Sequence, residues 1–230
     1  MAEVLFIYGP SGHGKSTGAR TLPPEDTVYI NADRKDLPWR GARKQYKTVP
    51  GANGYPDFDK SNYYEPSQAT SVRAIIDHFK NDPRQYIVYD TFTHLLINNF
   101  VERIKEKSWD KFNDFAKDTK DILDMLRDLP DGKRVVVLGH NFTDYDSGGN
   151  KVDKVRTIGK LLDEKIEIPS MFTVVLYPFV NRKKDEAEYG VYTQSNGTNF
   201  AKSPMGMFEY QEPNDYLALF EKMHSYYEGD

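Results

Sequence analysis

The sequence predicts an α/β protein in which helices cover both faces of a mostly parallel central sheet. Two observations support this prediction. Short apolar runs that are rich in β-branched and aromatic residues alternate along the chain with stretches of helical spacing. A glycine-rich turn at residues 9–16 directly follows the first apolar run, where a strand should end and a helix begin.

Five apolar runs have the length and the flanking turn residues of buried strands, at 4–8, 27–30, 86–89, 134–139 and 172–180. Runs that are apolar throughout are buried on both faces, and they therefore suit a parallel sheet between two helical layers. A sixth run at 189–194 alternates apolar and polar residues, so we expect it to pair as an edge strand.

Helical spacing of apolar residues recurs between these runs. We expect one helix at 67–79, two helices within 93–129 that break near 107–110, and a last helix at about 213–228. The glycine-rich turn should open only a short helix, because two prolines follow within ten residues. No repeat or domain boundary is visible, so residues 1–230 are expected to form a single domain with the last helix packed on it.

Two stretches interrupt the alternation of strands and helices. Residues 47–66 are rich in Pro, Gly, Asn and Tyr, which indicates a long irregular connection. Residues 143–154, with the sequence TDYDSGGNKVDK, are expected to form a mobile loop.

The bulk composition limits the classes of function. Of the 230 residues, 38% are hydrophobic and 29% are charged, as in ordinary globular proteins, and the formal net charge is −4. The surface as a whole therefore does not indicate nucleic-acid binding, although a local basic patch still could bind it. The absence of cysteine excludes disulfides, thiolate zinc sites and cysteine nucleophiles.

The glycine-rich turn GPSGHGKS fits the pattern G-x-x-x-x-G-K-[ST]. Several backbone N–H groups must point at one spot to hold the phosphates of a nucleotide, and glycine lets the chain curl that tightly. Lys15 supplies a positive charge for the β- and γ-phosphates, and the Ser16 hydroxyl is a candidate ligand of Mg²⁺. ATP is the expected nucleotide, and its predicted contacts are Gly9, Pro10, Ser11, Gly12, His13, Gly14, Lys15, Ser16 and Thr17.

A second magnesium ligand is expected at the end of a neighbouring strand. Asp90 follows four apolar residues in the sequence YIVYDT and is the candidate. The alternative is that Asp90 caps the following helix, because Asp and Thr both favour that position. Ser16 and Asp90 are thus the predicted metal ligands.

This order of motifs resembles the RecA-like P-loop ATPases, and it is similar to the compact RecA-like ATPases of bacteriophages that are associated with single-strand annealing and recombination. The resemblance covers about residues 4–210. It implies ATP hydrolysis in which Asp33 polarises the attacking water, although the family usually has Glu there. It also implies that His140, in VVVLGHN, senses the γ-phosphate. The predicted catalytic residues are then Lys15, Asp33, Asp90 and His140.

In RecA a DNA-contacting loop follows the sensor residue, and residues 142–162 stand in that place. Positive charge for the backbone and aromatic rings for the bases suit single-stranded nucleic acid. The alternative is a solvated loop, since Asp144, Asp146 and Asp153 nearly cancel the charge. The candidate contacts to single-stranded DNA are Phe142, Tyr145, Lys151, Lys154 and Arg156.

The resemblance further implies nucleotide sites that are completed between subunits, and hence a homo-oligomeric ring or filament. Lys202, in GTNFAKSPMGMF, matches a basic residue that lies near a neighbouring subunit's nucleotide. The phage pattern often has Arg two residues later, where this chain has Pro204, so Lys202 would act alone; a surface lysine is the alternative. No apolar run approaches the roughly 18 residues that span a bilayer. We therefore expect a cytoplasmic protein, in the host cytoplasm if a phage encodes it.

Two further features have no assigned role. Residues 34–47 hold six basic residues against one acid, and they could bind a polynucleotide, a partner subunit or nothing specific. The five histidines have no spacing that indicates zinc, while His94 could cap a helix or pack near the magnesium site.

Two other functions remain open. A small-molecule or nucleoside kinase would share the phosphate loop, but residues 93–129 have the spacing of packed helix rather than an Arg-rich lid. An ATP-gated loader or adaptor that binds a replication protein could have the same sequence features. Phosphate transfer to a nucleoside would favour the kinase, and ATP binding without DNA-stimulated hydrolysis would favour the adaptor.

Overall fold

The computed structural model describes residues 1–108, 110–158, 166–182 and 186–229. Its strands are β1 (Glu3–Gly9), β2 (Thr27–Asn31), β3 (Tyr63–Tyr64), β4 (Tyr86–Asp90), β5 (Arg134–Tyr145), β6 (Lys151–Val155), β7 (Val174–Arg182), β8 (Ala187–Tyr192) and β9 (Gln211–Pro213). Its α-helices are α1 (Lys15–Gly18), α2 (Ala42–Gln45), α3 (Ala69–Phe79), α4 (Phe92–Glu102), α5 (Asp110–Arg127) and α7 (Tyr216–Glu228).

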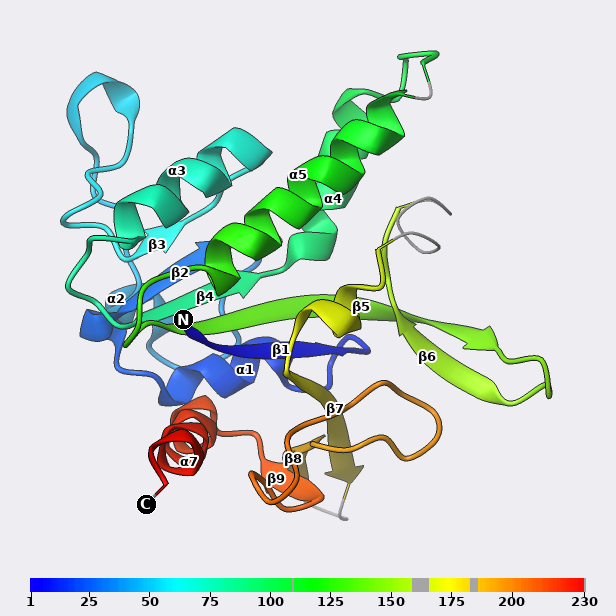
Figure 1. The fold of residues 1–230 in the computed structure, drawn as a ribbon. Helices are drawn as coiled ribbons and strands as arrows, with labels where there is room; N and C mark the ends of the chain where they lie inside the picture. The colour runs from blue at the N-terminus through cyan, green and yellow to red at the C-terminus, as the bar shows by residue number, and fades with distance from the viewer. Residues whose placement is uncertain (109, 159–165, 183–185, 230) are drawn as a thin grey trace.

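The strands form one sheet in the order β3-β2-β4-β5-β1-β7-β8-β9, and β6 pairs with the outer part of β5 (Figure 1). All pairs from β3 to β7 are parallel, whereas the pairs β7–β8, β8–β9 and β5–β6 are antiparallel. The predicted fold class, a mostly parallel central sheet with helices on both faces, is confirmed. Strand β5 lies between β1 and β4, so the glycine-rich turn and Asp90 follow strands that are not neighbours.

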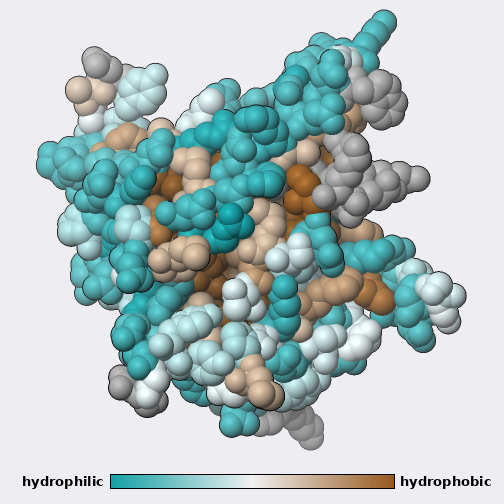
Figure 2. Space-filling view, in the orientation of Figure 1, coloured by the Kyte–Doolittle hydropathy of each residue, from teal (hydrophilic) through white to brown (hydrophobic). Residues whose placement is uncertain are grey.

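Alternating residues of β1 divide the core into two layers. Phe6 and Tyr8 belong to the apolar cluster beneath α3, α4 and α5, while Leu5 and Ile7 belong to the cluster on the side of α1 and α7 (Figure 1). Figure 2 shows that hydrophilic residues dominate the viewed surface and that apolar residues emerge in smaller patches between them. The helices therefore shield both faces of the sheet, as the apolar runs predict.

The predicted helices are confirmed with small shifts of their ends. The stretch 93–129 contains α4 and α5, separated by residues 103–109. Helix α1 is short and continues as a 3₁₀ turn at Ala19–Thr21. Helix α7 packs against the sheet through buried apolar residues, which include Leu219, Phe220 and Met223. Among the described residues, no helix has the combination of length and hydropathy that crossing a bilayer requires.

Two predictions about the later strands are wrong. Residues 143–154 are not a mobile loop, because β5 continues to Tyr145 and pairs with β6 as an antiparallel hairpin that projects from the sheet (Figure 1). The side chain of Asp153 accepts hydrogen bonds from Asn141 and Thr143 across the hairpin and from Tyr177 of β7, and the bond from Tyr177 ties the hairpin to the sheet. Strand β8 is not an edge strand either, since β9 pairs with its outer side.

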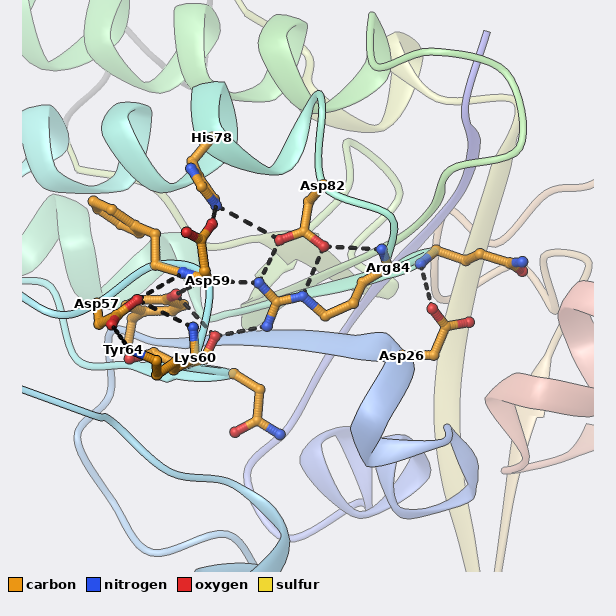
Figure 3. A network of polar contacts seen from close by, with 12 residues as sticks. Asp26, Asp57, Asp59, Lys60, Tyr64, His78, Asp82 and Arg84 are labelled. Carbon is orange, nitrogen blue, oxygen red and sulfur yellow. Dashed lines mark hydrogen bonds and ion pairs between the residues drawn. The ribbon is translucent and has the colours of Figure 1, made fainter.

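The irregular connection at 47–66 is held by a polar network around Arg84 (Figure 3). The guanidinium donates to the backbone oxygens of Ser61 at 2.6 Å and Phe58 at 3.0 Å, and it also pairs with Asp82. Nε2 of His78 lies 3.4 Å from the carboxylate of Asp59. The connection thus obtains from side chains the hydrogen bonds that regular structure would otherwise supply.

Candidate functional site

The glycine-rich turn links β1 to α1 and curls through two left-handed residues. Gly12 has φ = 77° and Gly14 has φ = 84°, a region that other residues adopt at a cost. A Cβ at Gly14 would also lie 2.7 Å from a ring carbon of Tyr189. Glycine at position 14 is therefore required both by the backbone conformation and by the close approach of β8.

The side chain of Lys15 is folded into this turn. Its Nζ donates to the backbone oxygen of Gly9 at 2.7 Å and to that of Pro10 at 2.9 Å, and the residue is 6% exposed. Burial lowers the pKa of Lys15 to about 8, while the carboxylates of Asp90 and Asp33 act in the opposite direction. The turn thus holds a concentrated positive charge at the point where phosphates would sit.

Asp90 ends β4 and is buried, with 4% of its surface exposed. The Tyr29 hydroxyl donates to its Oδ2 at 2.6 Å. Burial raises the pKa of Asp90, and hydrogen bonds with Ser16 and Tyr29 oppose this effect. A carboxylate and a hydroxyl are oxygen ligands of the kind that Mg²⁺ prefers, and a cation would offset the cost of burying Asp90. Ser16 and Asp90 therefore fit the predicted metal.

Asp33 lies just beyond β2 and faces the same pocket. Its Oδ2 is 3.0 Å from Nζ of Lys35, and its Oδ1 is 3.0 Å from Nε2 of His94. Oδ1 has no hydrogen bond, so the contact with His94 is one of proximity without hydrogen-bond alignment. One carboxylate oxygen of Asp33 is therefore still available as an acceptor.

His140 follows the buried part of β5, directly opposite Gly9 in the register of β1 and β5. Its backbone N–H donates to the Thr93 hydroxyl at 3.1 Å, and its side-chain Nε2 is buried without a partner. Burial, assisted by the charge of Lys15, lowers the pKa of His140 to about 4. The imidazole is thus neutral at pH 7 and has an unused nitrogen inside the site.

His94 is a site residue that the sequence did not single out for a strong role. It lies in the first turn of α4, where Thr91 caps the helix by accepting a hydrogen bond from the backbone of His94. The Thr91 hydroxyl also lies 3.0 Å from Nδ1 of His94. The ring packs edge-to-face against His140 with centroids 5.2 Å apart.

Asp33, His94 and His140 together form a cluster that could hold a metal ion. One ligand atom from each of the three residues lies within 4.8 Å of the others. The histidines have no zinc-like spacing along the sequence, but the folded chain brings two of them beside Asp33, because separate elements can group ligands that sequence spacing does not. One sequence feature could have identified His94 as a site residue: it lies four residues beyond Asp90, which ends a strand.

Three residues late in the chain also brace the phosphate loop. The Asn214 side chain donates to the backbone oxygen of Gly14 at 2.7 Å. The Tyr216 hydroxyl, fully buried in α7, donates to the backbone oxygen of Lys15. Tyr189 packs against Gly14 and lines the pocket. No local motif marks these positions, since they are about 175 to 200 residues away along the chain.

These groups surround a cavity of about 460 Å³. Of the predicted nucleotide contacts, its lining includes Ser11, Gly12, Gly14, Lys15, Ser16 and Thr17. Gly9 and Pro10 contribute through their carbonyl groups to Lys15, whereas the ring of His13 lies 3.1 Å from the backbone oxygen of Ser11. The predicted catalytic residues Lys15, Asp33, Asp90 and His140 all line this cavity.

The structure separates the candidate DNA contacts between the two sides of the β5–β6 hairpin. Phe142 pairs with Lys154, and Tyr145 pairs with Lys151 three positions further along, which places these pairs on opposite faces. Nζ of Lys154 is 2.6 Å from the carboxylate of Asp144. Tyr145 is 60% exposed, and Lys151 and Arg156 are exposed. The part of residues 142–162 beyond 158 lies outside the described residues.

Lys202 lies beside β7 rather than at the cavity. Its backbone exchanges two hydrogen bonds of 2.8 Å with Val175. Its side chain is half-buried, and Lys202 is not among the residues that line the cavity. Within one chain it is therefore separate from the phosphate loop.

Comparison with known proteins places this site in a family context. The family model described as an AAA domain matches residues 1–205. A KaiC-like protein from the hyperthermophilic archaeon Pyrococcus horikoshii OT3 is similar over 87% of this chain and 82% of its own, with 14% identity and a TM-score of 0.46. The flagellar accessory protein FlaH from Methanocaldococcus jannaschii is similar over 91% of this chain and 83% of its own, with 11% identity and a TM-score of 0.47. No curated protein matches the chain.

Proposed function

The chain belongs to the AAA domain family, and on this premise we propose that it is a RecA-like ATPase that binds ATP with Mg²⁺ and hydrolyses the bond between its β- and γ-phosphates. One observation carries the proposal. The phosphate loop, Asp33, Asp90 and His140 come from separate segments and yet line one cavity. Phosphoryl transfer to water needs this combination of positive charge, metal ligand and water-orienting group.

Each residue has a distinct part in this proposal. Lys15 brings its ammonium to the developing charge on the phosphoryl oxygens. Asp33 accepts a hydrogen bond from the attacking water through Oδ1, which has no hydrogen bond in the structure. His140, neutral because burial lowers its pKa, donates from Nε2 to a γ-phosphate oxygen and thereby reports its presence.

Ser16 and Asp90 are the residues that would hold Mg²⁺. Bound there, the ion would neutralise charge on the β- and γ-phosphates. The buried carboxylate of Asp90 is kept in place by the Tyr29 hydroxyl, which orients it toward the phosphate loop.

We further propose that the β5–β6 hairpin contacts single-stranded DNA in a recombination, annealing or replication reaction of the phage type. The hairpin begins directly after His140, and the backbone N–H of Arg156 donates to the His140 oxygen at 2.7 Å. A change at the γ-phosphate that moves His140 can therefore move the adjoining hairpin, which carries the exposed Tyr145, Lys151 and Arg156. Aromatic rings beside positive charge suit single strands of any sequence.

The test is the rate of ATP hydrolysis with and without single-stranded DNA at low and at moderate salt. We expect Lys15→Ala to lower the rate at least about 100-fold, because it removes charge stabilisation in the transition state. Lys117→Ala, which removes an exposed lysine of α5, is the matched control. DNA should raise the wild-type rate, and salt should weaken that rise because phosphate contacts release counterions.

The outcomes separate the competing functions. Near-wild-type turnover by Lys15→Ala would refute the ATPase proposal. A rate that ignores DNA at both salt concentrations would shift the function to an ATP-gated adaptor of a replication protein. Phosphate recovered on an added nucleoside rather than in water would identify a kinase.

A further inference from the structure

The cluster of Asp33, His94 and His140 has the donor set of a transition-metal site. Two imidazoles and one carboxylate are the ligands that bind Zn²⁺ in open catalytic sites and other first-row ions in similar sites. We propose that these three residues bind one divalent ion of the Zn²⁺ class, distinct from Mg²⁺ at Ser16 and Asp90, and that the bound ion inhibits ATP hydrolysis.

Two buried atoms of the cluster have no hydrogen-bond partner among the described residues. They are Oδ1 of Asp33 and Nε2 of His140. Buried polar atoms are nearly always hydrogen-bonded, so two such atoms in one small cluster need an explanation. A metal ion between them would satisfy both.

The contact between Asp33 and His94 has the geometry of neighbouring ligands. Oδ1 and Nε2 lie 3.0 Å apart, but no hydrogen bond joins them. An oxygen and a nitrogen that are this close without hydrogen-bond alignment can each direct a lone pair at the same third position, where a metal ion would sit. One ligand atom from His140 lies within 4.8 Å of both, so a small movement closes the set around an ion.

The surroundings leave one ring nitrogen of each histidine available to a metal ion. The Thr91 hydroxyl, 3.0 Å from Nδ1 of His94, occupies the other ring nitrogen, which is the usual arrangement behind a metal-bound histidine. Nε2 of His140 has no hydrogen bond with any described residue, so no competing contact holds it away from a metal ion. The charge of Lys35 opposes binding, but its ammonium pairs with Oδ2 of Asp33 and not with Oδ1.

Inhibition follows from the roles of the same residues, and this half of the inference rests on the proposed ATPase function. A carboxylate that ligates the ion through Oδ1 can no longer accept a hydrogen bond from the attacking water. A metal-bound Nε2 of His140 likewise has no proton to donate to the γ-phosphate. Both groups are therefore lost to hydrolysis while the ion is bound.

The test uses tag-free, nucleotide-free protein of full length. Co²⁺ is the spectroscopic probe, and Zn²⁺ binding is measured by titration calorimetry. We expect one ion per chain and a visible absorption band of nitrogen- and oxygen-ligated Co²⁺. His94→Ala and His140→Ala should each weaken binding by more than about tenfold, as losses around metal sites do. His224→Ala, a histidine of α7 whose side chain is 54% exposed, is the matched control.

A second pair of variants keeps the test decisive if an alanine variant fails to fold. Thr91→Ser retains the hydroxyl behind His94 and should bind like the wild type, whereas Thr91→Val should bind about tenfold more weakly. Unaltered affinity in both His94→Ala and His140→Ala, or no binding by the wild type, would overturn the inference.

Metal binding and hydrolysis fail independently in this design. Ion binding that depends on His94 and His140 in a chain without ATPase activity would support the metal site and refute the proposed function. An active ATPase that binds no Co²⁺ or Zn²⁺ would do the reverse. Zn²⁺ that inhibits the wild type and His94→Ala equally would overturn the inhibitory role.

Discussion

The ammonium of Lys15 is buried in a site that is shaped for phosphate. Without nucleotide, two backbone oxygens and the nearby carboxylates of Asp33 and Asp90 are what compensates its charge. Burial nevertheless lowers its pKa from 10.5 to about 8, which means that the folded chain disfavours the charged form. The difference corresponds to about 3 kcal/mol at neutral pH.

Removing this charge should stabilise the nucleotide-free protein. Between pH 8 and 10.5 the unfolded chain binds more protons at Lys15 than the folded chain does, so wild-type stability rises with pH across this window. We expect Lys15→Met to raise the free energy of unfolding by up to about 3 kcal/mol at pH 7. This gain should nearly disappear by pH 10.5, where Lys15 is neutral in the folded chain and only half-protonated in the unfolded chain.

Urea unfolding of wild type and Lys15→Met at pH 7 and pH 10 checks this prediction. Lys117→Met, at an exposed lysine of α5, should leave stability nearly unchanged at both pH values. A difference between wild type and Lys15→Met that is the same at both pH values would contradict the role assigned to burial.

Helix α7 supports the phosphate loop from the far end of the chain. Tyr216 is fully buried, and its hydroxyl donates to the backbone oxygen of Lys15 in α1. A helix as short as α1 has little stability of its own, because nucleating a helix is costly. The hydrogen bonds from Asn214 and Tyr216 therefore stabilise α1 and the phosphate loop, which the local sequence cannot do by itself.

Tyr216→Phe should loosen the phosphate loop without opening a cavity. The loss of one buried hydrogen bond is expected to cost about 1–2 kcal/mol of unfolding free energy and to raise the KM for ATP. Tyr227→Phe, on the same helix but 51% exposed, should change neither quantity. Denaturant unfolding and ATP titration of the hydrolysis rate measure both, and equal effects in the two variants would argue against the brace.

The β5–β6 hairpin shows how an element can escape sequence prediction. Its paired segments, 141–145 and 151–155, carry Asn, Asp and Lys between single Phe, Tyr and Val residues instead of an apolar run, so their composition indicates strands only weakly. Besides the backbone pairing, the side chain of Asp153 accepts hydrogen bonds from Asn141 and Thr143 of β5 and from Tyr177 of β7. Such a strand is held by polar contacts to the main sheet, and these contacts appear only once the chain is folded.

The parallel sheet brings the whole site to one edge. The ends of β1, β2, β4 and β5 lie side by side, since Asn31 is opposite Asp90 and Gly9 is opposite His140. Lys202 is the one proposed contact to nucleotide that lies outside this arrangement, beside Val175 of β7. Its proposed role consequently requires a second subunit.

Mixing two defective variants tests that role. Lys15→Ala lacks a working phosphate loop but retains Lys202, and Lys202→Ala has the opposite defect. If Lys202 acts across an interface, the mixture should recover hydrolysis, because some interfaces combine both intact groups. Each variant alone should be slow, and a mixture no faster than the sum of its components would exclude action in trans.

Much of the fold and part of the site could be predicted because the signals are local. Apolar runs specify buried strands, and the turn with Gly14, Lys15 and Ser16 places its chemistry within eight consecutive residues. Asp90 and His140 are also predictable, since each follows a buried run and parallel strands end at a common edge. The order and residue types along the chain are sufficient for these conclusions.

The remaining site residues depend on packing between distant segments. His94 reaches Asp33 because α4 starts beside the edge of the sheet, and Tyr189 and Tyr216 reach the phosphate loop because β8 and α7 fold back onto it. No spacing along the chain encodes these contacts, whose energies arise from burial and from satisfying polar groups far apart in sequence. The sequence thus predicts the phosphate chemistry, while the folded chain determines which side chains complete it.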